Sequence, residues 1–460
     1  MDLPGLNITG STSNEINTID LEPEREWRFE VGLDSTVTVE ILQGTAEIFG
    51  TEIVIGRVYS FTAAKLSIYT WHGCKFEWKG EVLAEYISEE SAMWRYANLH
   101  FALEKMRMIA AEKDPFFSST KLPGPDGEGP RVLIVGQPNS GKTTLAKILT
   151  SYAVKMGRTP VVVSLDPKEP MLSVPGTISA ASYSGMIDVE EEETWGSSKT
   201  TEQTHIPTKS PIVYFFGSDS PADNVRFYKA LLNRLSIALS SRLAIDHKSR
   251  IAGTIIDAAG LTDQKVGYDV INSIVSDFNV DVIVTVGNER LYNDLRKRYS
   301  SRPNMSLVMV PMSGGVVRNE ESYNRALQQR LIKQYFYGTP KTALSAYSVT
   351  IDMSAIVVYR RLEQSHLVGS SALPIGADET MAQEALITKM EVGPVLQNSV
   401  LALLYASPTD AVDDIAVASV TGFAHIIDVD ETKKNLKILL PIKSKLLTHV
   451  YLMGSYHYIE

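Results

Sequence analysis

The sequence contains a single cysteine, Cys74, among its 460 residues. One cysteine excludes an internal disulfide and any zinc site built from several cysteines, and it favours a reducing compartment. The eight histidines are scattered without the spacing of metal ligands. No run approaches the roughly 18 apolar residues that span a bilayer, and the N-terminus has no basic stretch followed by an apolar one. We therefore expect neither a membrane span nor a signal peptide.

An excess of positive charge is also lacking. The formal net charge of −10 argues against a protein that coats nucleic acid by bulk electrostatics, although a local basic groove remains an open alternative. A chain of 460 residues is too long for one hydrophobic core, because single cores stop growing near roughly 250 to 300 residues. We expect two or three domains in a soluble, intracellular protein.

Residues 1–92 have the pattern of a small all-β domain, similar to a sandwich. Apolar residues such as Trp27, Phe29 and Val31 alternate with polar ones, and glycines separate the runs. A helix is predicted from about Ala92 to Lys113, because apolar residues recur there at helical spacing. Residues 114–130 are rich in Pro, Gly and Ser and are expected to form a linker.

A different pattern begins at Arg131 and predicts an α/β domain over residues 93–338. Five short apolar runs (131–136, 160–166, 251–257, 280–287 and 306–311) are separated by helical stretches. Such runs indicate a mostly parallel sheet with helices on both faces. The acidic and Ser/Thr-rich residues 189–210 are predicted to be a surface insertion. Alternation returns in residues 339–460, which are expected to form a second all-β domain.

The segment from Gly136 to Thr143 matches the phosphate-binding loop (P-loop) pattern G-x-x-x-x-G-K-[ST], with a predicted strand before it and a helix after it. Gly136 and Gly141 let successive backbone N–H groups face phosphate oxygens. The helix that begins at Lys142 adds the positive end of its dipole. Lys142 neutralises the outer phosphates, and the Thr143 hydroxyl can ligate Mg²⁺. The sequence predicts that the chain binds ATP with Mg²⁺.

Two aspartates end predicted strands: Asp166 and Asp257. Carboxylates at this position beside a P-loop usually hold Mg²⁺ or act as a base, while capping a helix or a turn is the alternative for either one. The stretch from Asp257 to Gly260 also has the D-x-x-G form, in which the glycine N–H senses the γ-phosphate. No N-K-x-D motif for reading guanine is present, which disfavours a GTPase.

A predicted helix within residues 288–299 carries four cationic residues, Arg290, Arg296, Lys297 and Arg298. They are candidates for a lid that reaches phosphates or RNA. A solvated basic face is the alternative, and the spacing alone slightly favours it.

The sequence resembles the polynucleotide 5′-hydroxyl kinases of the pre-mRNA 3′-end cleavage machinery over nearly its whole length. The landmarks include EWRFEV (26–31), GPRVLIVGQPNSGKTT (129–144), NERLYNDL (288–295) and SGGVV (313–317). The resemblance implies that ATP lies between the N-terminal and central domains. It also implies that Glu26 and Lys65 hold the nucleotide from the N-terminal side, while the phosphates contact Asn139, Ser140, Gly141, Lys142, Thr143 and Thr144.

The chain departs from the active members of this family at two places. Where they carry D-x-G-Q, this chain reads Asp166-Pro-Lys168-Glu169, which places a negative charge beside the triphosphate. A like charge at roughly 5 Å costs on the order of 3 kcal/mol at an effective dielectric near 20. Where they carry a tryptophan that stacks on RNA, this chain has Leu261, which forfeits about 1–3 kcal/mol of stacking. Both changes, and the insertion at Trp195, resemble the fungal branch of the family, which keeps ATP without clear kinase activity.

Three hypotheses about function follow. The first is a non-catalytic ATP-holding subunit of the cleavage and polyadenylation factor in the nucleus. Its expected partners are a scaffold subunit of cleavage factor I that binds the RNA polymerase II C-terminal domain, the other subunits and, as an open alternative, RNA. The second is an active RNA 5′-hydroxyl kinase that uses Lys142, Asp166 and an arginine, Arg290 or Arg296. The third is an ATPase switch built on Asp257 and Gly260.

Overall fold

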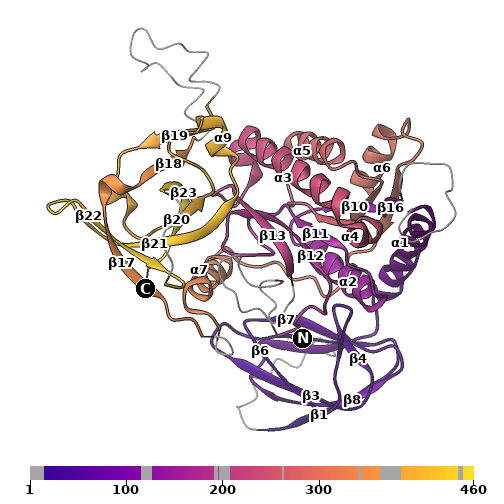
Figure 1. Ribbon diagram of the computed structural model, residues 1–460. Helices are drawn as coiled ribbons and strands as arrows, with labels where there is room; N and C mark the ends of the chain where they lie inside the picture. The colour runs from indigo at the N-terminus through magenta and orange to yellow at the C-terminus, as the bar shows by residue number, and fades with distance from the viewer. Residues whose placement is uncertain are drawn as a thin grey trace.

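The computed structural model describes residues 15–114, 127–190, 195, 208–261, 264–339, 343–362, 385–443 and 449–459. Figure 1 shows a β-rich lobe at the N-terminal end, a central α/β lobe and a second β-rich lobe at the C-terminal end. This is the expected fold class, which is confirmed. The domain boundaries at 92/93 and 338/339 stay predictions, and most of the expected linker lies outside the described residues. None of the helices in the described ranges is long and apolar enough to cross a membrane.

The N-terminal lobe is a sandwich of two sheets. One has the strand order β1-β8-β3-β6, and the other has the order β5-β4-β7-β2-β9. Alternating large side chains fill the space between the sheets, and Trp27 stacks on Phe29 with ring centroids 4.3 Å apart. In chain order the strands are β1 Asn17–Leu21, β2 Glu26–Glu30, β3 Thr36–Gly44, β4 Ala46–Ile48, β5 Thr51–Ile53, β6 Val58–Thr62, β7 Lys65–Tyr69, β8 Cys74–Gly80 and β9 Ala84–Ser88.

The central lobe is built on a seven-stranded sheet with the order β13-β12-β11-β14-β10-β15-β16. The five strands at one end of this order, β11-β14-β10-β15-β16, are all parallel to their neighbours within that group. The five apolar runs predicted from the sequence form these parallel strands: β10 Arg131–Gly136, β11 Val161–Ser164, β14 Thr254–Asp257, β15 Val282–Val286 and β16 Ser306–Val310.

Helices cover both faces of this sheet. The connection from β10 to β11 moves across the sheet towards β13. The connections from β14 to β15 and from β15 to β16 move in the opposite direction, towards the β16 edge. Because such crossovers are right-handed, α2 lies on one face and α5 and α6 on the other. α1 packs on α2, and α3 packs on α5 (Figure 1). The helices are α1 Met93–Lys113, α2 Lys142–Lys155, α3 Val225–Ile245, α4 His247–Ala252, α5 Gln264–Asp277, α6 Glu289–Arg298 and α7 Glu321–Tyr337, with a short 3-10 helix, η1 Pro221–Asn224, before α3.

The sheet also contains two strands that the apolar runs did not indicate, β12 Thr177–Tyr183 and β13 Thr208–Phe215. β12 is antiparallel to β11, and β13 is antiparallel to β12. They correct the expectation that residues 189–210 are only a surface insertion, because β13 begins inside that range. Within the same range Trp195 is 2% exposed, and its backbone N–H donates to the Met171 carbonyl. The remaining residues of that prediction, 191–194 and 196–207, lie outside the described residues.

The C-terminal lobe is a seven-stranded sheet with the order β17-β22-β21-β20-β23-β18-β19. Its strands are β17 Tyr347–Asp352, β18 Val357–Arg361, β19 Ile387–Met390, β20 Ser399–Leu404, β21 Val420–Asp430, β22 Asn435–Leu440 and β23 Val450–His457, with short helical turns at η2 Met353–Ala355, η4 Pro394–Leu396 and α9 Val412–Ala416. β13 of the central sheet packs on β21. Phe215 meets Phe423 there with ring centroids 5.4 Å apart, so the two lobes share one hydrophobic cluster.

The N-terminal sandwich has a hydrophobic core of its own, and its contacts with the rest of the chain include many polar ones. Thr51 contacts Ser151 at 3.1 Å, and Tyr152 donates to Glu47. α7 extends the contacts, because the Tyr323 hydroxyl donates to the carbonyl of Ala63. The same helix reaches the C-terminal lobe, where the Tyr335 hydroxyl accepts from the backbone N–H of Phe423. α7 therefore touches both β-rich lobes.

Candidate nucleotide-binding site

The P-loop turns between β10 and the N-terminus of α2 as the sequence predicts. Asn139 and Gly141 adopt left-handed backbone angles, with φ of 53° and 84°. Gly136 is needed for a different reason, because a Cβ there would lie 2.7 Å from the Ser140 hydroxyl oxygen. The buried ammonium of Lys142 donates to the Gln137 carbonyl at 3.0 Å, within its own loop. The turn therefore combines a cation, a helix N-terminus and backbone N–H groups.

The two aspartates meet the P-loop at the carboxyl ends of neighbouring strands β11 and β14. The Thr143 hydroxyl donates to Asp257 Oδ2 at 2.6 Å. Asp166 accepts from the backbone N–H groups of Lys168 at 3.1 Å and Gly260 at 3.4 Å. Gly260 approaches closely, since a Cβ there would lie 2.6 Å from the nitrogen of Pro138. Both carboxylates named from the sequence thus lie beside the P-loop.

Burial controls the protonation of these carboxyl groups. It raises the pKa of Asp257 to about 7, against the opposing effects of the Lys142 charge and the Thr143 hydrogen bond. Burial also raises the pKa of Asp166, although Lys142 and two backbone N–H groups favour its charged form. A positive charge that enters between them would lower both pKa values.

The donor set fits a hard divalent cation such as Mg²⁺. Asp257 Oδ1 is buried and accepts no hydrogen bond, while its other oxygen already holds the Thr143 hydroxyl. No group of three or more His, Cys, Asp or Glu side chains in the described residues could hold a metal by itself. Mg²⁺ commonly takes only one or two protein oxygens and completes its shell with phosphates and water. Thr143, Asp166 and Asp257 therefore suit a cation that arrives with a nucleotide.

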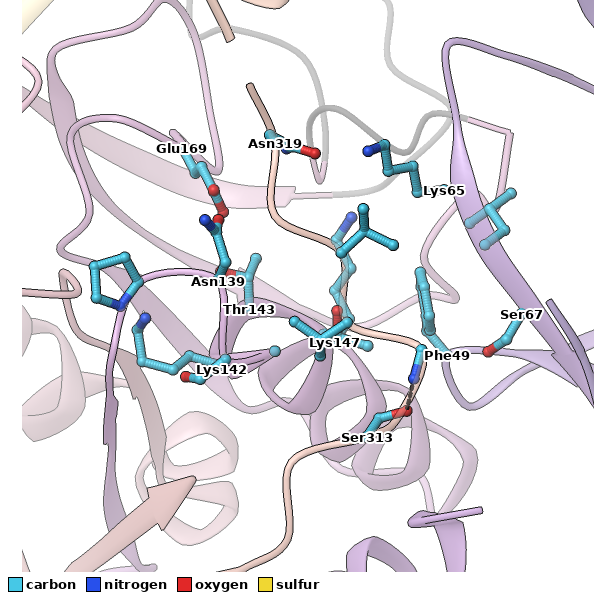
Figure 2. A pocket seen from close by; sticks show the side chains of 18 of the residues that line it. Phe49, Lys65, Ser67, Asn139, Lys142, Thr143, Lys147, Glu169, Ser313 and Asn319 are labelled. Atoms are coloured by element: carbon cyan, nitrogen blue, oxygen red, sulfur yellow. Dashed lines mark hydrogen bonds between the residues drawn. The ribbon is translucent and has the colours of Figure 1, made fainter. Parts of the chain in front are cut away.

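A cavity of about 530 Å³ opens over the P-loop, within the range of small-molecule sites. Figure 2 looks into it: Asn139, Lys142 and Thr143 of the P-loop face Phe49, Lys65 and Ser67 of the sandwich. Its wall includes most residues predicted to contact ATP, namely Glu26, Lys65, Asn139, Ser140, Gly141, Lys142, Thr143 and Thr144. The cavity lies between the N-terminal sandwich and the central lobe, as the resemblance implied.

The two residues assigned from the resemblance lie in unequal surroundings. Glu26 is buried, 4% exposed, and its carboxylate accepts from Arg28 Nε at 2.8 Å. Lys65 is half-buried, pairs with Glu30 at 3.3 Å and lies 4.9 Å from the ring centre of Tyr323 on α7. Composition alone would assign both to the surface, whereas each lines the cavity.

Several wall residues were not singled out from the sequence. They come from β2, from the loop after β16, from α7 and from the segment after β13, and include Arg28, Asp219, Ser313, Gly315, Asn319 and Gln328. The only sequence signal among them is the paired glycine of SGGVV, because glycines mark close backbone approach. Arg28 lies within the landmark EWRFEV, although only Glu26 of that stretch was predicted to be a site residue, and no signal in the sequence pointed to Asp219.

Several residues discussed from the sequence do not line the cavity, and the predicted site residues Gly136 and Asp257 are among them. Arg290 and Arg296 are exposed on α6, and neither is among the residues that line the cavity. The alternative, a solvated basic face, describes their position in this structure. Leu261 packs against the central hydrophobic cluster and likewise does not line the cavity. Lys168 and Glu169, the departures from D-x-G-Q, do line it.

Three family models together match nearly the whole chain. The mRNA cleavage and polyadenylation factor CLP1 P-loop matches residues 136–338. The N-terminal beta-sandwich domain of polyadenylation factor matches residues 20–110, and the pre-mRNA cleavage complex II protein Clp1 matches residues 344–460. Each model covers one of the three lobes.

Curated relatives cover nearly the full length. The mRNA cleavage and polyadenylation factor clp1 of Botryotinia fuckeliana is 41% identical, over 96% of this chain and 93% of its own. The corresponding factor of Yarrowia lipolytica is 37% identical over 100% of both chains.

Two solved structures share the fold. One describes an extended interface between Pcf11p and Clp1p and the basis for ATP loss in a glycine-to-arginine mutant. It matches this chain with a TM-score of 0.85 at 27% identity, and the match covers 98% of this chain and 100% of that one. The other, wild-type Clp1p bound to a Pcf11p segment, has a TM-score of 0.83 at 27% identity and the same coverage. Fold, phosphate loop and relatives agree that this chain belongs to the CLP1 family of mRNA cleavage and polyadenylation factors.

Proposed function

We propose that this chain is the ATP-binding subunit of the mRNA cleavage and polyadenylation factor, required for endonucleolytic cleavage and polyadenylation of pre-mRNA. In this proposal ATP serves mainly as a structural cofactor. The supporting observation is the position of the cavity, whose wall combines Glu26 and Lys65 of the sandwich with Lys142 of the P-loop. A ligand that binds only the assembled arrangement stabilises it by mass action, about 2.7 kcal/mol at 100 times Kd.

The cation proposed to accompany ATP is Mg²⁺. Thr143, Asp257 and Asp166 would hold it, and it would neutralise charge on the outer phosphates. The unpartnered Oδ1 of Asp257 supports this assignment.

The extra carboxylate of Glu169 argues for storage of ATP over its transfer. Active members share the aspartate at position 166, but Glu169 adds a second negative charge to the cavity wall, where developing negative charge on a transferred phosphoryl group would need cations. Lys168 offsets part of this charge, but its side chain occupies the position where active members have glycine. The arginines Arg290 and Arg296, proposed for charge stabilisation in a kinase, lie outside the cavity wall.

The proposed partner is a scaffold subunit similar to Pcf11p, which binds the Clp1p relatives in the solved complexes. We propose that this scaffold also binds the RNA polymerase II C-terminal domain and that the chain works in the nucleus with the other subunits of the factor. A bound nucleotide would fix the lobes in the pose that the partner recognises.

The test begins with the nucleotide that co-purifies with the protein, identified by chromatography after denaturation. We expect ATP at near one equivalent, and its loss from a Lys142→Ala, Thr143→Ala double variant. Capture of the Pcf11-like partner should fall with the nucleotide. Undiminished capture by the nucleotide-free variant would contradict the structural role of ATP.

An active RNA 5′-hydroxyl kinase is the alternative function, because Lys142 and Asp166 meet beside the P-loop as that reaction requires. Labelled ATP and an oligonucleotide with a 5′-hydroxyl end decide between the two functions. Incorporation no greater than that of an Asp166→Ala variant supports the structural role, whereas incorporation well above that control supports the kinase. Hydrolysis of bound ATP within hours would instead favour an ATPase switch that uses Asp257 and Gly260.

A further inference from the structure

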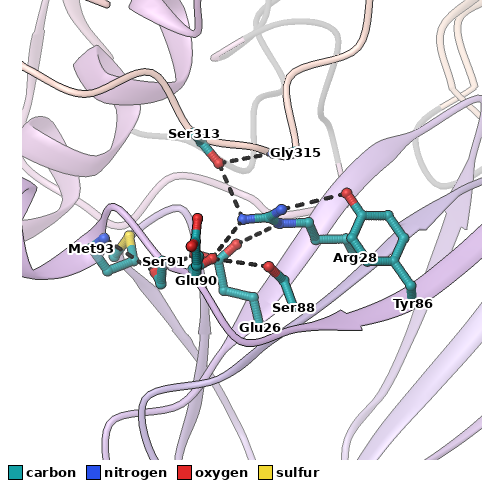
Figure 3. A network of polar contacts seen from close by, with 9 residues as sticks. All are labelled: Glu26, Arg28, Tyr86, Ser88, Glu90, Ser91, Met93, Ser313 and Gly315. Carbon is teal, nitrogen blue, oxygen red and sulfur yellow. Dashed lines mark hydrogen bonds and ion pairs between the residues drawn. The ribbon is translucent and has the colours of Figure 1, made fainter. Parts of the chain in front are cut away.

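The side chain of Arg28, on β2 of the sandwich, lies at the centre of a polar network beside the cavity (Figure 3). Its Nε donates to Glu26 at 2.8 Å, and one Nη donates to the Tyr86 hydroxyl at 3.4 Å. The other Nη donates to the Glu90 carbonyl at 3.0 Å and to the Ser313 hydroxyl at 3.5 Å. Arg28 is 7% exposed, so its charge depends on these partners.

The loop that Arg28 holds belongs to the central lobe and connects β16 to α7. Gly315 packs against the arginine so closely that a Cβ there would lie 2.8 Å from Arg28 Cδ and Nε. The Ser313 hydroxyl both accepts from Arg28 and accepts from the N–H of Gly315 at 3.2 Å. The paired glycines of this loop are therefore explained by the arginine.

The same loop lies over the P-loop. A methyl group of Val316 would be 3.4 Å from a Cβ placed at Gly141, the residue before the P-loop lysine. Gly315, Val316 and Asn319 all line the cavity. The side-chain oxygen of Asn319 is buried and accepts no hydrogen bond, which makes it an acceptor available to a donor on a bound ligand.

We propose that Arg28 is a positioning residue of the nucleotide site, which holds Glu26 and the loop Ser313–Asn319 together as one wall opposite the P-loop. The inference rests on the proposed binding of ATP. A guanidinium suits this task because its planar fork presents five N–H donors in fixed directions, whereas a lysine ammonium is a single point charge. Without Arg28, Glu26 and the loop are no longer held in register, and the nucleotide must order them as it binds.

A double-mutant cycle with ATP affinity as the readout tests this proposal. Arg28→Ala should weaken ATP binding by about tenfold or more, and Arg28→Lys should restore only part of it. Gly315→Ala should weaken binding by a similar factor in the wild-type background, because the new methyl group displaces the arginine. In the Arg28→Ala background the same glycine substitution should change affinity by less than about twofold, since nothing remains to displace.

The matched control is Arg57→Ala, which removes a different arginine of the sandwich that pairs with Glu190 at 3.1 Å outside the cavity wall. It should leave ATP affinity within about twofold. Melting of the nucleotide-stripped variants checks that each one folds. If Arg28→Ala does not fold, the ATP affinity of Gly315→Ala still tests the role of Arg28. Equal effects of Gly315→Ala in both backgrounds, or unchanged affinity in Arg28→Ala, would overturn the role of Arg28. A wild-type protein that binds no ATP would overturn the proposed function itself.

Discussion

At the scale of single residues, Gly141 is a position where the P-loop requires glycine for its backbone conformation. Its φ of 84° strains any side chain, and Val316 lies where a Cβ would point. Left-handed backbone costs a non-glycine residue roughly 1–2 kcal/mol. We expect Gly141→Arg to lose ATP, with affinity reduced about tenfold or more. The readout is the nucleotide released from the purified protein on denaturation.

Gly157 supplies a matched control for this substitution. It has a similar φ of 74°, lies just after the same helix, and has open space around it, since a Cβ there would meet nothing within 4 Å. Gly157→Arg carries the same backbone strain away from the P-loop, so it should retain ATP. Equal nucleotide loss in both variants would mean that general destabilisation, and not the geometry at Gly141, removes the ligand.

A second residue-scale prediction concerns pH. Burial raises the pKa of Asp257 to about 7 in the nucleotide-free protein, against about 3.9 in an unfolded chain. Between these two values the folded state keeps a proton that the unfolded state has released. The contribution of this group to stability therefore falls as pH rises from about 4 to about 7 and is constant above that.

Asp257→Asn, neutral at every pH, isolates this effect. In stripped protein it should raise the melting temperature by a few degrees at pH 8, and the difference from wild type should shrink towards pH 5. Melting curves across this range, recorded without Mg²⁺ or nucleotide, provide the measurement. A difference that does not vary with pH would show that Asp257 is already ionised in the folded protein.

The residues of the site differ in how far the sequence could reveal them. The P-loop was predictable because its geometry is local: eight consecutive residues determine the turn and the start of the helix. The contact of Arg28 with Ser313 joins residues separated by 285 positions, and only the folded chain brings them together. For Arg290 and Arg296 the sequence left a lid and a solvated basic face as alternatives and slightly favoured the second, and they lie on an exposed helix face.

At the scale of elements, the hairpin of β4 and β5 fixes the sandwich to the P-loop helix α2. Tyr152 on α2 donates to the buried carboxylate of Glu47, and Lys155 pairs with the same residue at 3.3 Å. Gly50 at the hairpin tip lets the backbone approach α2, because a Cβ there would be 3.1 Å from the Ile148 carbonyl. The hairpin therefore docks on α2 through polar contacts, and the Tyr152 hydroxyl is one of the donors to the buried Glu47 carboxylate.

Tyr152→Phe should weaken the docking of the hairpin on α2 by about 1–3 kcal/mol of free energy, because the buried carboxylate of Glu47 loses a hydrogen-bond donor. Faster hydrogen exchange is expected for the backbone amides of residues 46–53, with exchange in the central strand β14 unchanged. Tyr59→Phe is the control, since that hydroxyl accepts from Val54 inside the sandwich and does not reach α2. Comparable exchange in Tyr152→Phe and wild type would exclude a docking role.

Elements were predictable where hydrophobicity is strong and continuous. The parallel strands β10, β11, β14, β15 and β16 stood out as runs of Val, Ile and Leu. β12 reads TISAASY, so its buried positions are filled by small and hydroxylated side chains that resemble a loop. Ser/Thr-rich composition likewise masked the start of β13. β12 has strand neighbours on both sides, and β13 pairs with β12 and packs on β21. No local sequence pattern records such tertiary neighbours.

At the scale of the whole molecule, the lobes are joined unequally. The C-terminal lobe has a core of its own but also contributes many residues to the hydrophobic cluster of the central lobe. The sandwich has a separate core and, of its strand residues, contributes only Tyr69 to that cluster, with Phe49 and Trp71 packed against it. Polar interfaces between domains usually permit relative motion. The cavity lies at the interface between the sandwich and the central lobe, so a nucleotide there strengthens the weaker of the two junctions.

Calorimetry of stripped and ATP-loaded protein tests this division. Without nucleotide we expect the sandwich to melt first and separately, since its core is its own and many of its contacts with the central lobe are polar. MgATP at 100 times Kd adds about 2.7 kcal/mol to the joined state, which should shift that first transition upward until it merges with the second. The Lys142→Ala, Thr143→Ala variant should keep two transitions at every ATP concentration. If ATP raised only the transition of the central and C-terminal lobes, the nucleotide would be bound by the P-loop alone and would not join the sandwich to it.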